Sequence, residues 1–362
     1  MLALVVCIGF AVLGETALRI ARFRYPTRAE RDVIWSQERD LQLAAQQFYQ
    51  RDAREIWKPV PGARVPWTDG ERLDPWGFRG EPLAPERRSG VVRIAVLGSS
   101  EALGVGLPRE RCWPFLLGAA IAEQGAQAEI LCAAVEDSTL AQGLERWRAE
   151  VLAFRPDLVL CTYAGEMESR AAPCGCTDAQ RIADNCGHGF PDLRERPERV
   201  PPFAREARLV QSGLWLRDLL GGDYWRARAS ELEAQRLAAR QEFPESRGPR
   251  RVSLEEFAAL VGQLDEELTR AGAKLILFPI PGEKLLRGES PVVGAYQATL
   301  LARAHELQIS RLSGWELFER ELAAGARVED LFSDGRLNEG GQRVLGREIA
   351  KVLVPRLKEL VR

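Results

Sequence analysis

Histidine is almost absent from this sequence. Its 362 residues include only two, His188 and His305, so any chemistry that requires an imidazole base has two candidates. A basic surplus is missing as well, because 50 Lys and Arg residues face 52 Asp and Glu residues, for a formal net charge of -2. Proteins that bind nucleic acid usually carry a basic face, so we expect no nucleic-acid partner.

An apolar run long enough to cross a membrane without interruption is also missing. Residues 2–14 are all apolar or Gly, whereas a spanning helix needs about 20 such residues. The helical pattern continues past Glu15 and Arg19 to Phe23, which allows one span with a polar outer end. A cleaved signal peptide is the alternative, but no small-residue cleavage site is evident. We expect an uncleaved transmembrane helix that anchors the protein in membrane lipid through residues 2–23.

The charges beside this segment bear on the orientation of the main domain. No basic residue precedes the apolar run, and the arginines nearest to it follow it. The positive-inside rule would then place the main domain in the cytoplasm. These arginines are Arg19, Arg22, Arg24 and Arg28.

Beyond the anchor (residues 1–24), composition divides the chain into two further parts. Residues 25–90 are rich in Arg, Pro and Trp and have weak periodicity, which indicates a linker or collar. Residues 91–362 alternate short apolar strands with amphipathic helices, which is typical of an α/β domain with a parallel sheet covered on both faces. Strands are expected at 92–97, 129–134, 158–163, 274–280 and 308–312, and helices at 113–124, 139–154, 254–271, 291–306 and 340–361.

The stretch 164–253 interrupts this alternation and is interpreted as an insertion over the strand ends. It includes a charged helix at about 204–243 with one apolar face, for which packing against the domain is favoured over partner binding. A disulfide is favoured over a zinc site in its first part, because the spacing of the candidate ligands matches no strong zinc signature. No metal or other cofactor is expected. The candidate ligands are Cys174, Cys176, Cys186 and His188.

The turn after the first strand is the most informative segment of the domain. Ligands of parallel α/β sheets bind at the carboxyl ends of the strands. The first strand runs into Gly98-Ser99-Ser100, which is typical of a sharp strand-to-helix turn that exposes one side chain and several backbone N–H groups. Ser100 is therefore the candidate nucleophile, and Gly98 and Ser99 belong to the same candidate cleft.

Several segments together resemble one family. Gly98-Ser-Ser-Glu-Ala102 resembles the Gly-Asp-Ser-x-x turn of the SGNH (GDSL-type) hydrolases. Asp74-Pro-Trp-Gly-Phe-Arg-Gly80 is similar to a lead-in of their membrane-anchored bacterial branch, and Arg155-Pro-Asp-Leu-Val159 to the approach to their third block. The resemblance covers nearly the whole chain except 164–253 and rests on order and spacing, since no motif is intact.

This resemblance implies a flavodoxin-like α/β fold with about five parallel strands. It also implies a periplasmic or otherwise extracytoplasmic main domain, against the charge count at the N-terminus. In the family, an Asp-x-x-His pair in the final block activates the serine. Here Asp334 is followed by Leu337, so the resemblance gives Ser100 and Asp334 the positions of a nucleophile and a relic partner, without the base.

The oxyanion hole of the family is altered in the same way. The resemblance places Ala134 where a Gly donates its backbone N–H, and Gly165-Glu166 where Gly-Asn supplies a side-chain donor. A carboxylate repels a developing oxyanion, and the loss of one donor costs about 10²–10³ in rate. Glu166 could act as a substitute base if burial raised its pKa, but a relic pocket is the favoured interpretation. His188 is not favoured as a base, and His305 is expected to face solvent.

The sequence therefore favours a membrane-anchored, catalytically inactive SGNH-like protein. Such a protein would serve as a structural or binding subunit for a membrane-protein complex or a cell-surface glycan. The alternative is an O-acyl esterase or acyltransferase that acts on cell-envelope carbohydrate with Ser100 as its nucleophile. The two hypotheses differ in whether any group can take the proton from Ser100.

Overall fold

The computed structural model describes residues 2–21, 23, 48–86, 88–170, 177–183, 207–220, 250–333 and 335–360. These fall into two compact units. The α/β unit comprises Gln47–Pro191 and Ser246–Arg362, and the N-terminal unit comprises Met1–Gln46 and Asp192–Glu245. Each unit is described by itself.

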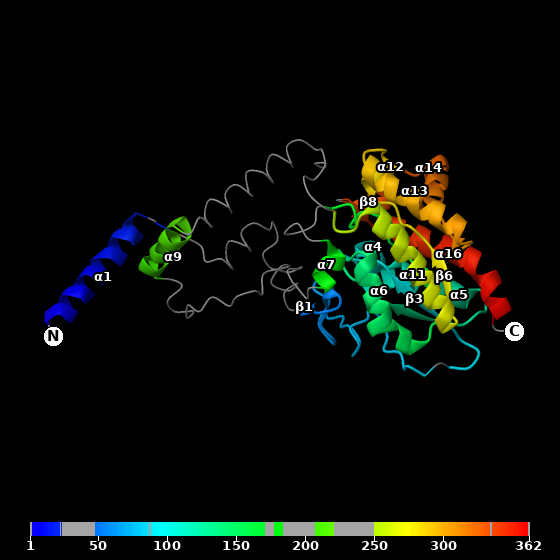
Figure 1. Ribbon diagram of the computed structural model, residues 1–362, viewed down its shortest axis with the longest axis horizontal. Coiled ribbons are helices and arrows are strands. Elements are labelled where there is room, and N and C mark those ends of the chain that lie inside the picture. The colour runs from blue at the N-terminus through cyan, green and yellow to red at the C-terminus, as the bar shows by residue number, and fades with distance from the viewer. Residues whose placement is uncertain are drawn as a thin grey trace. The chain divides into compact units, whose positions relative to one another are not determined.

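A five-stranded sheet forms the centre of the α/β unit (Figure 1). Every pair of neighbouring strands is parallel, and their order is β4-β3-β5-β6-β7. This is the flavodoxin-like order, in which the first strand of the sheet lies between the second and the third. The expected α/β sheet of about five parallel strands is confirmed. The strands are β3 (Val92–Leu97), β4 (Ala128–Cys132), β5 (Leu158–Cys161), β6 (Lys274–Leu277) and β7 (Ser310–Arg311).

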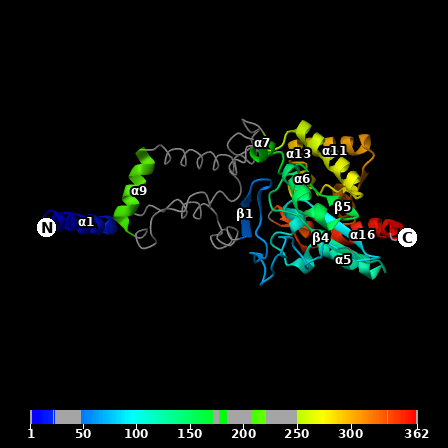
Figure 2. The same cartoon turned by 60° about the horizontal axis from the view of Figure 1, so that its bottom comes forward.

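Helices cover both faces of this sheet because its strands alternate their side chains between two cores. In β3, Ile94 and Val96 join one buried cluster, while Ala95 and Leu97 join the other. The first cluster includes apolar residues of α5 (Trp113–Glu123) and α16 (Glu339–Leu360), and the second includes those of the helices on the opposite face (Figure 2). These are α6 (Leu140–Ala149), α11 (Leu254–Ala271) and α13 (Pro291–Glu306).

Short elements connect these layers at the ends of the strands. They are α4 (Ser100–Leu103), the 3-10 helices η1 (Arg109–Arg111) and η2 (Val151–Phe154), α7 (Asp178–Ala183), α12 (Glu283–Leu286), α14 (Gly314–Ala323), α15 (Val328–Leu331), β8 (Phe332–Ser333) and β9 (Arg336–Leu337).

The described part of the segment expected to be a linker or collar contains an antiparallel hairpin, which the weak periodicity did not reveal. Strands β1 (Tyr49–Asp52) and β2 (Ile56–Pro59) pair over their full length. We call the described residues 48–86 and 88–90 the collar. Its aromatic residues Tyr49 and Trp57 are buried in the same cluster as Ile94, so the collar is part of the core.

Buried arginines fasten the collar to the sheet. Arg146 of α6 donates to the carbonyl of Gly77 in the collar, at 3.2 Å, and pairs with the collar's Glu55 at 3.1 Å. Arg79 of the collar is buried and forms a bidentate pair with Glu71, with both N–O distances 2.8 Å. Because each guanidinium is out of water, its partners have to be present in the folded protein.

Arg79 also binds the turn that carries Ser100. Its Nη1 donates to the carbonyls of Leu103 and Gly104, and its Nη2 donates to the carbonyl of Leu107 at 2.7 Å. One collar side chain therefore terminates α4 and fixes the loop that follows it.

The N-terminal unit consists, in its described part, of helices α1 (Leu2–Ile20) and α9 (Arg208–Leu220). The helix expected at the N-terminus is present, and it ends three residues before Phe23. Across the described residues, no helix is long and apolar enough to cross a membrane. The remainder of the helix expected at about 204–243 lies outside the described residues.

Arg79→Met should lower the free energy of unfolding of the α/β unit by about 3–5 kcal/mol, because it leaves the Glu71 carboxylate and three carbonyls without their buried donor. Urea denaturation of the full chain measures this change. The exposed Arg72, which donates to the Gly62 carbonyl, supplies the control Arg72→Met, expected within about 0.5 kcal/mol of the parent.

The double variant Glu71→Gln/Arg79→Met should recover part of the loss, since no charge is then left unpaired. If Arg79→Met were no more harmful than Arg72→Met, the buried guanidinium would not fasten the collar.

Candidate functional site

Ser100 lies at the first position of α4, directly after β3 ends. The turn needs glycine at position 98, because a Cβ there would lie 1.9 Å from Oγ1 of Thr162, the residue that follows β5. The chain leaves α4 through Gly104, which has a φ of 72° and suits the left-handed conformation. Close packing of the turn against β5 and Arg79 holds Ser100 in place, with only 7% of its surface exposed.

The partner of Ser100 is a backbone amide. The N–H of Asp137 donates to Ser100 Oγ at 3.3 Å. In the described part of the chain, no imidazole or carboxylate is hydrogen-bonded to this hydroxyl. Asp137 itself has a φ of 54°, so its amide is aimed at the serine by a left-handed backbone that Asp tolerates better than most residues.

None of the described positions expected to complete a catalytic set is hydrogen-bonded to the Ser100 hydroxyl. Leu337 is buried in β9 within the core cluster that contains Ile94. Its side chain packs against the start of α16, where a Cβ at Gly341 would lie 2.7 Å from Leu337 Cδ2. His305 is exposed on α13, as expected. Asp334, His188 and the expected cysteine loop of Cys174, Cys176 and Cys186 lie outside the described residues.

Carboxylates gather at this edge of the sheet instead. We call Glu101, Glu136, Asp137 and Glu166 the acidic cluster. They follow β3, β4 and β5, whose carboxyl ends meet at one edge. Arginines approach them loosely, with Arg170 at 4.0 Å from Asp137 and 3.8 Å from Glu166, and Arg336 at 3.6 Å from Glu136.

Burial controls the electrostatics of this cluster. It raises the pKa of Glu101 to about 7, with further increases from the charges of Glu166 and Asp137 and a partial decrease from Arg336. Burial and the charge of Asp137 also raise the pKa of Glu136 to about 7. The pKa of Glu166 is raised by burial, although Arg170 counteracts this increase. Protons therefore bind this edge more readily than they bind free carboxyl groups.

The other expected cleft residues line the turn without offering reactive groups. Ala134 is buried after β4, and Ser99 Oγ is buried without a hydrogen-bond partner. Gly165 has a φ of 92°, and a Cβ there would lie 2.1 Å from the Tyr296 Cβ, so helix α13 approaches the backbone directly. The backbone next to Glu166 is therefore fixed by the packing of Gly165 against α13.

Buried thiols do not add chemistry to the described part of the α/β unit. Cys112, Cys132 and Cys161 are free and buried, and burial raises the pKa of Cys132 to about 11 and of Cys161 to about 12. Cys132 and Cys161 are core residues, each with 1% of its surface exposed. Within the described residues, no group of three or more His, Cys, Asp or Glu side chains could hold a metal ion.

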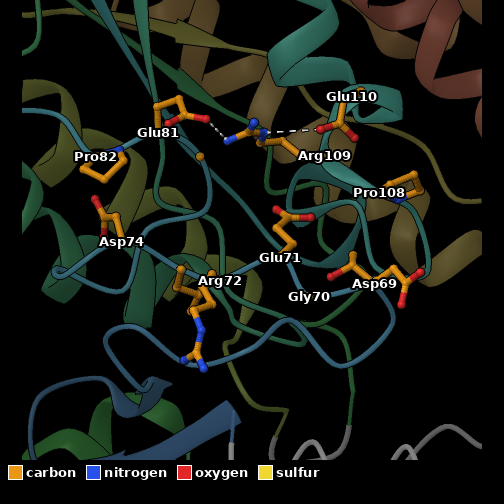
Figure 3. A pocket seen from close by; sticks show the side chains of 13 residues that line it. Asp69, Gly70, Glu71, Arg72, Asp74, Glu81, Pro82, Pro108, Arg109 and Glu110 are labelled. Carbon is orange, nitrogen blue, oxygen red and sulfur yellow. Dashed lines mark hydrogen bonds and ion pairs between the residues drawn. The ribbon is translucent and has the colours of Figure 1, made fainter.

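A separate pocket of about 630 Å³ lies on the collar (Figure 3). Figure 3 shows Arg109 between Glu81 and Glu110, with which it forms ion pairs. Asp69 and Glu71 also line the pocket. Its walls come from residues 68–74, 80–82 and 108–110 and do not include Ser100. No sequence pattern predicted this pocket, because its walls are turns of the collar together with residues 108–110.

No protein-family model and no curated protein matches this sequence. The structure resembles solved structures of lipolytic hydrolases and acetyl xylan esterases. One, assigned to the G-D-S-L lipolytic family of Desulfitobacterium hafniense, is 16% identical with a TM-score of 0.41, over 72% of this chain and 99% of that chain. A lipase/acylhydrolase from Enterococcus faecalis is 12% identical with a TM-score of 0.43, over 73% and 96%. The acetyl xylan esterase AlAXEase is 13% identical with a TM-score of 0.44, over 72% and 100%. The activities in these names belong to those proteins, and the fold of this chain is established by its own strand order.

The raised pKa values predict that the protein loses stability as the pH rises. The folded form of Glu101 keeps its proton up to a pKa of about 7, whereas the unfolded form releases it near 4.5. Between these values the folded state binds more protons, so the free energy of unfolding falls with increasing pH and then levels off.

Glu101→Gln should reduce the loss between about pH 5 and pH 8 by about 1–2 kcal/mol, as measured by urea denaturation at each pH. Glu55 and Glu168, whose pKa values are also raised to about 7, contribute equally to parent and variant. The exposed Glu289 supplies the control Glu289→Gln. An identical pH profile for parent and Glu101→Gln would show that Glu101 is not a buried acid.

Proposed function

We propose that this protein is a membrane-attached, non-hydrolytic SGNH-like protein that binds a ligand at the strand ends. One observation carries the proposal. The hydroxyl of Ser100 is held by the amide of Asp137 at 3.3 Å, and no base of the described part of the chain is bonded to it. Removing the base or the serine of a serine hydrolase costs about 10⁶ in rate.

The charges beside Ser100 support the same proposal. Acyl transfer from an ester builds negative charge on the former carbonyl oxygen, which an esterase stabilises with preorganised donors. Here Glu166, whose pKa is raised by burial, stands where the family resemblance places a donor. Two cations at this edge, Arg170 and Arg336, are engaged with the acidic cluster at 3.6–4.0 Å. An oxyanion at this position would be repelled by the negative charge of the carboxylates.

The same edge suits a polyhydroxylated ligand. Asp137 and Glu166 are about one-third exposed, with 31% and 36% of their side-chain surface accessible, and Arg170 and Arg336 are exposed. Sugar hydroxyls can donate to the carboxylates and accept from the guanidinium groups, and charge-assisted bonds of this kind are the stronger ones. We propose a cell-envelope glycan as the ligand, with capture of a membrane protein as the competing outcome.

Attachment to the membrane completes the proposal. The apolar N-terminal segment forms α1, which would hold the protein on the membrane with the α/β unit on the extracytoplasmic side, as the resemblance implies. Protease added to spheroplasts tests that side. Degradation of the α/β unit supports it, and protection would place the unit in the cytoplasm.

Purified protein should hydrolyse p-nitrophenyl acetate no faster than its Ser100→Ala variant, because no base in the described part of the chain is bonded to the hydroxyl. Leu337→His should not create activity, since position 337 points into the core. It should instead lower the free energy of unfolding by about 2–4 kcal/mol, as expected for a polar group buried in a core. Turnover by the parent that Ser100→Ala abolishes would show that the protein is an esterase.

Binding of envelope polysaccharide fragments, measured by isothermal titration calorimetry, should weaken by about tenfold or more in Arg170→Met/Arg336→Met, because two charge-assisted hydrogen-bond donors are lost. The exposed Arg343, which pairs with Glu339 on α16 at 3.0 Å, supplies the control Arg343→Met. Equal binding by both variants, or capture of a membrane protein without glycan binding, would contradict a glycan site at the strand ends.

A further inference from the structure

Helices α1 and α9 are fastened to each other within the N-terminal unit, although they are far apart in the sequence. The backbone N–H of Leu209 donates to Glu15 Oε2 at 2.9 Å. The rings of Phe23 and Trp215 meet edge to face with centroids 6.2 Å apart. Both views show α9 beside the C-terminal half of α1 (Figures 1 and 2). The inserted helix therefore belongs with the N-terminal helix.

Leu209 of α9 lies directly over Gly14 of α1. A Cβ at Gly14 would lie 3.4 Å from Leu209 Cδ2, in van der Waals contact. Leu209 thus packs over the backbone of α1 at Gly14 while 38% of its surface is exposed. It connects the apolar surface of one helix with that of the other.

The pair leaves an extensive apolar surface open. On α1, Phe10, Leu13 and Ile20 are 72%, 68% and 79% exposed, at spacings that place them along one side of the helix. On α9, Leu216 and Leu220 are 48% and 79% exposed, one turn apart. Large apolar side chains gathered in this way mark a surface that contacts a partner or a lipid.

The only acidic residue of α1 is already satisfied inside the pair. Glu15 accepts from the amide of Leu209, at the N-terminus of α9, and pairs with Arg19 at 2.7 Å. A carboxylate bonded in this way places far less charge in an apolar medium than an unpaired one. The contact with α9 therefore reduces the cost of placing Glu15, which follows the apolar run of α1, next to an apolar medium.

The charges at the end of α1 favour lipid as the occupant. Arg19 is 60% exposed in its side chain, and the sequence continues with Arg22, Arg24 and Arg28. Each basic residue near an anionic membrane surface contributes about 1 kcal/mol of attraction. An apolar surface beside such a basic segment matches the acyl and headgroup layers of a bilayer.

We propose that α1 and α9 form one lipid-binding unit, in which α9 is a second helix in contact with the bilayer. This inference rests on the membrane attachment proposed above for α1 and assigns a role to the inserted helix. The occupant is an anionic phospholipid bilayer. A second protein helix is the alternative that the experiment separates.

A solvatochromic amino acid at position 220 of the full chain tests the inference in phosphatidylglycerol-containing vesicles that carry nitroxide on their acyl chains. Leu152 of the α/β unit, 42% exposed, supplies the matched control position. We expect quenching at position 220 to exceed that at position 152 by about threefold or more. Leu216→Glu should bring the quenching at 220 down towards the control, whereas Leu254→Glu, at an exposed leucine of the α/β unit, should leave it unchanged.

Flotation of the parent protein with the same vesicles separates the two proposals. Protein that floats while positions 220 and 152 are quenched equally would overturn the role of α9 and leave attachment through α1 intact. A protein helix bound to α9 would shield position 220 from the acyl chains. Positions 220 and 152 would then be quenched equally, which would also overturn the lipid assignment. Protein that does not float would overturn both proposals.

Discussion

The guanidinium of Arg79 is the contact on which the Ser100 turn depends. It is fully out of water, and it joins Glu71 of the collar to the carbonyls of Leu103 and Leu107 beyond α4. A charged group can be buried only when its partners are in place. The collar, α4 and the loop after it therefore form together, and the position of Ser100 is a consequence of that assembly.

The turn holds Ser100 in a fixed position, but in the described part of the chain no base is bonded to its hydroxyl. Ser100 lies at the turn after β3, but the contact of its oxygen is the N–H of Asp137, a donor that cannot take the hydroxyl proton. The same edge of the sheet carries Glu101, Glu136 and Glu166, whose pKa values are raised by burial, that of Glu101 to about 7. A scaffold that preserves the turn while surrounding it with acids suits recognition better than acyl transfer, since fold alone does not imply activity.

Regular elements of the α/β unit could be predicted where the sequence pattern and the packing agree. The expected strand at Val92–Leu97 and helix at 254–271 have the predicted bounds, because an unbroken apolar strand and a capped amphipathic helix are strong local signals. The strand expected at 274–280 pairs only through Leu277, two residues before Pro279, which has no N–H for a ladder. Hairpin β1–β2 was missed because its turn lacks a glycine signal and because β2 begins at Ile56 with a φ of 65°.

The site was predictable in place and only partly in content. The strand-end rule located Ser100 and Glu166 correctly at one edge of the sheet. The rule would also have pointed to Glu136 and Asp137, which follow β4, had the turn after each strand been searched for carboxylates. The hydrogen bond to the Ser100 hydroxyl comes from the backbone N–H of Asp137. A backbone donor is available at almost every residue type, so the sequence could not predict this bond.

Labelling with a fluorophosphonate probe, followed by mass spectrometry of the peptide that contains Ser100, tests the central claim most directly. Fluorophosphonates react with serines whose hydroxyl is activated by a neighbouring base. The account predicts no modification of Ser100 in folded protein, at a level equal to that of Ser100→Ala. Stoichiometric labelling of Ser100 that is lost on unfolding would show an activated nucleophile and would contradict it.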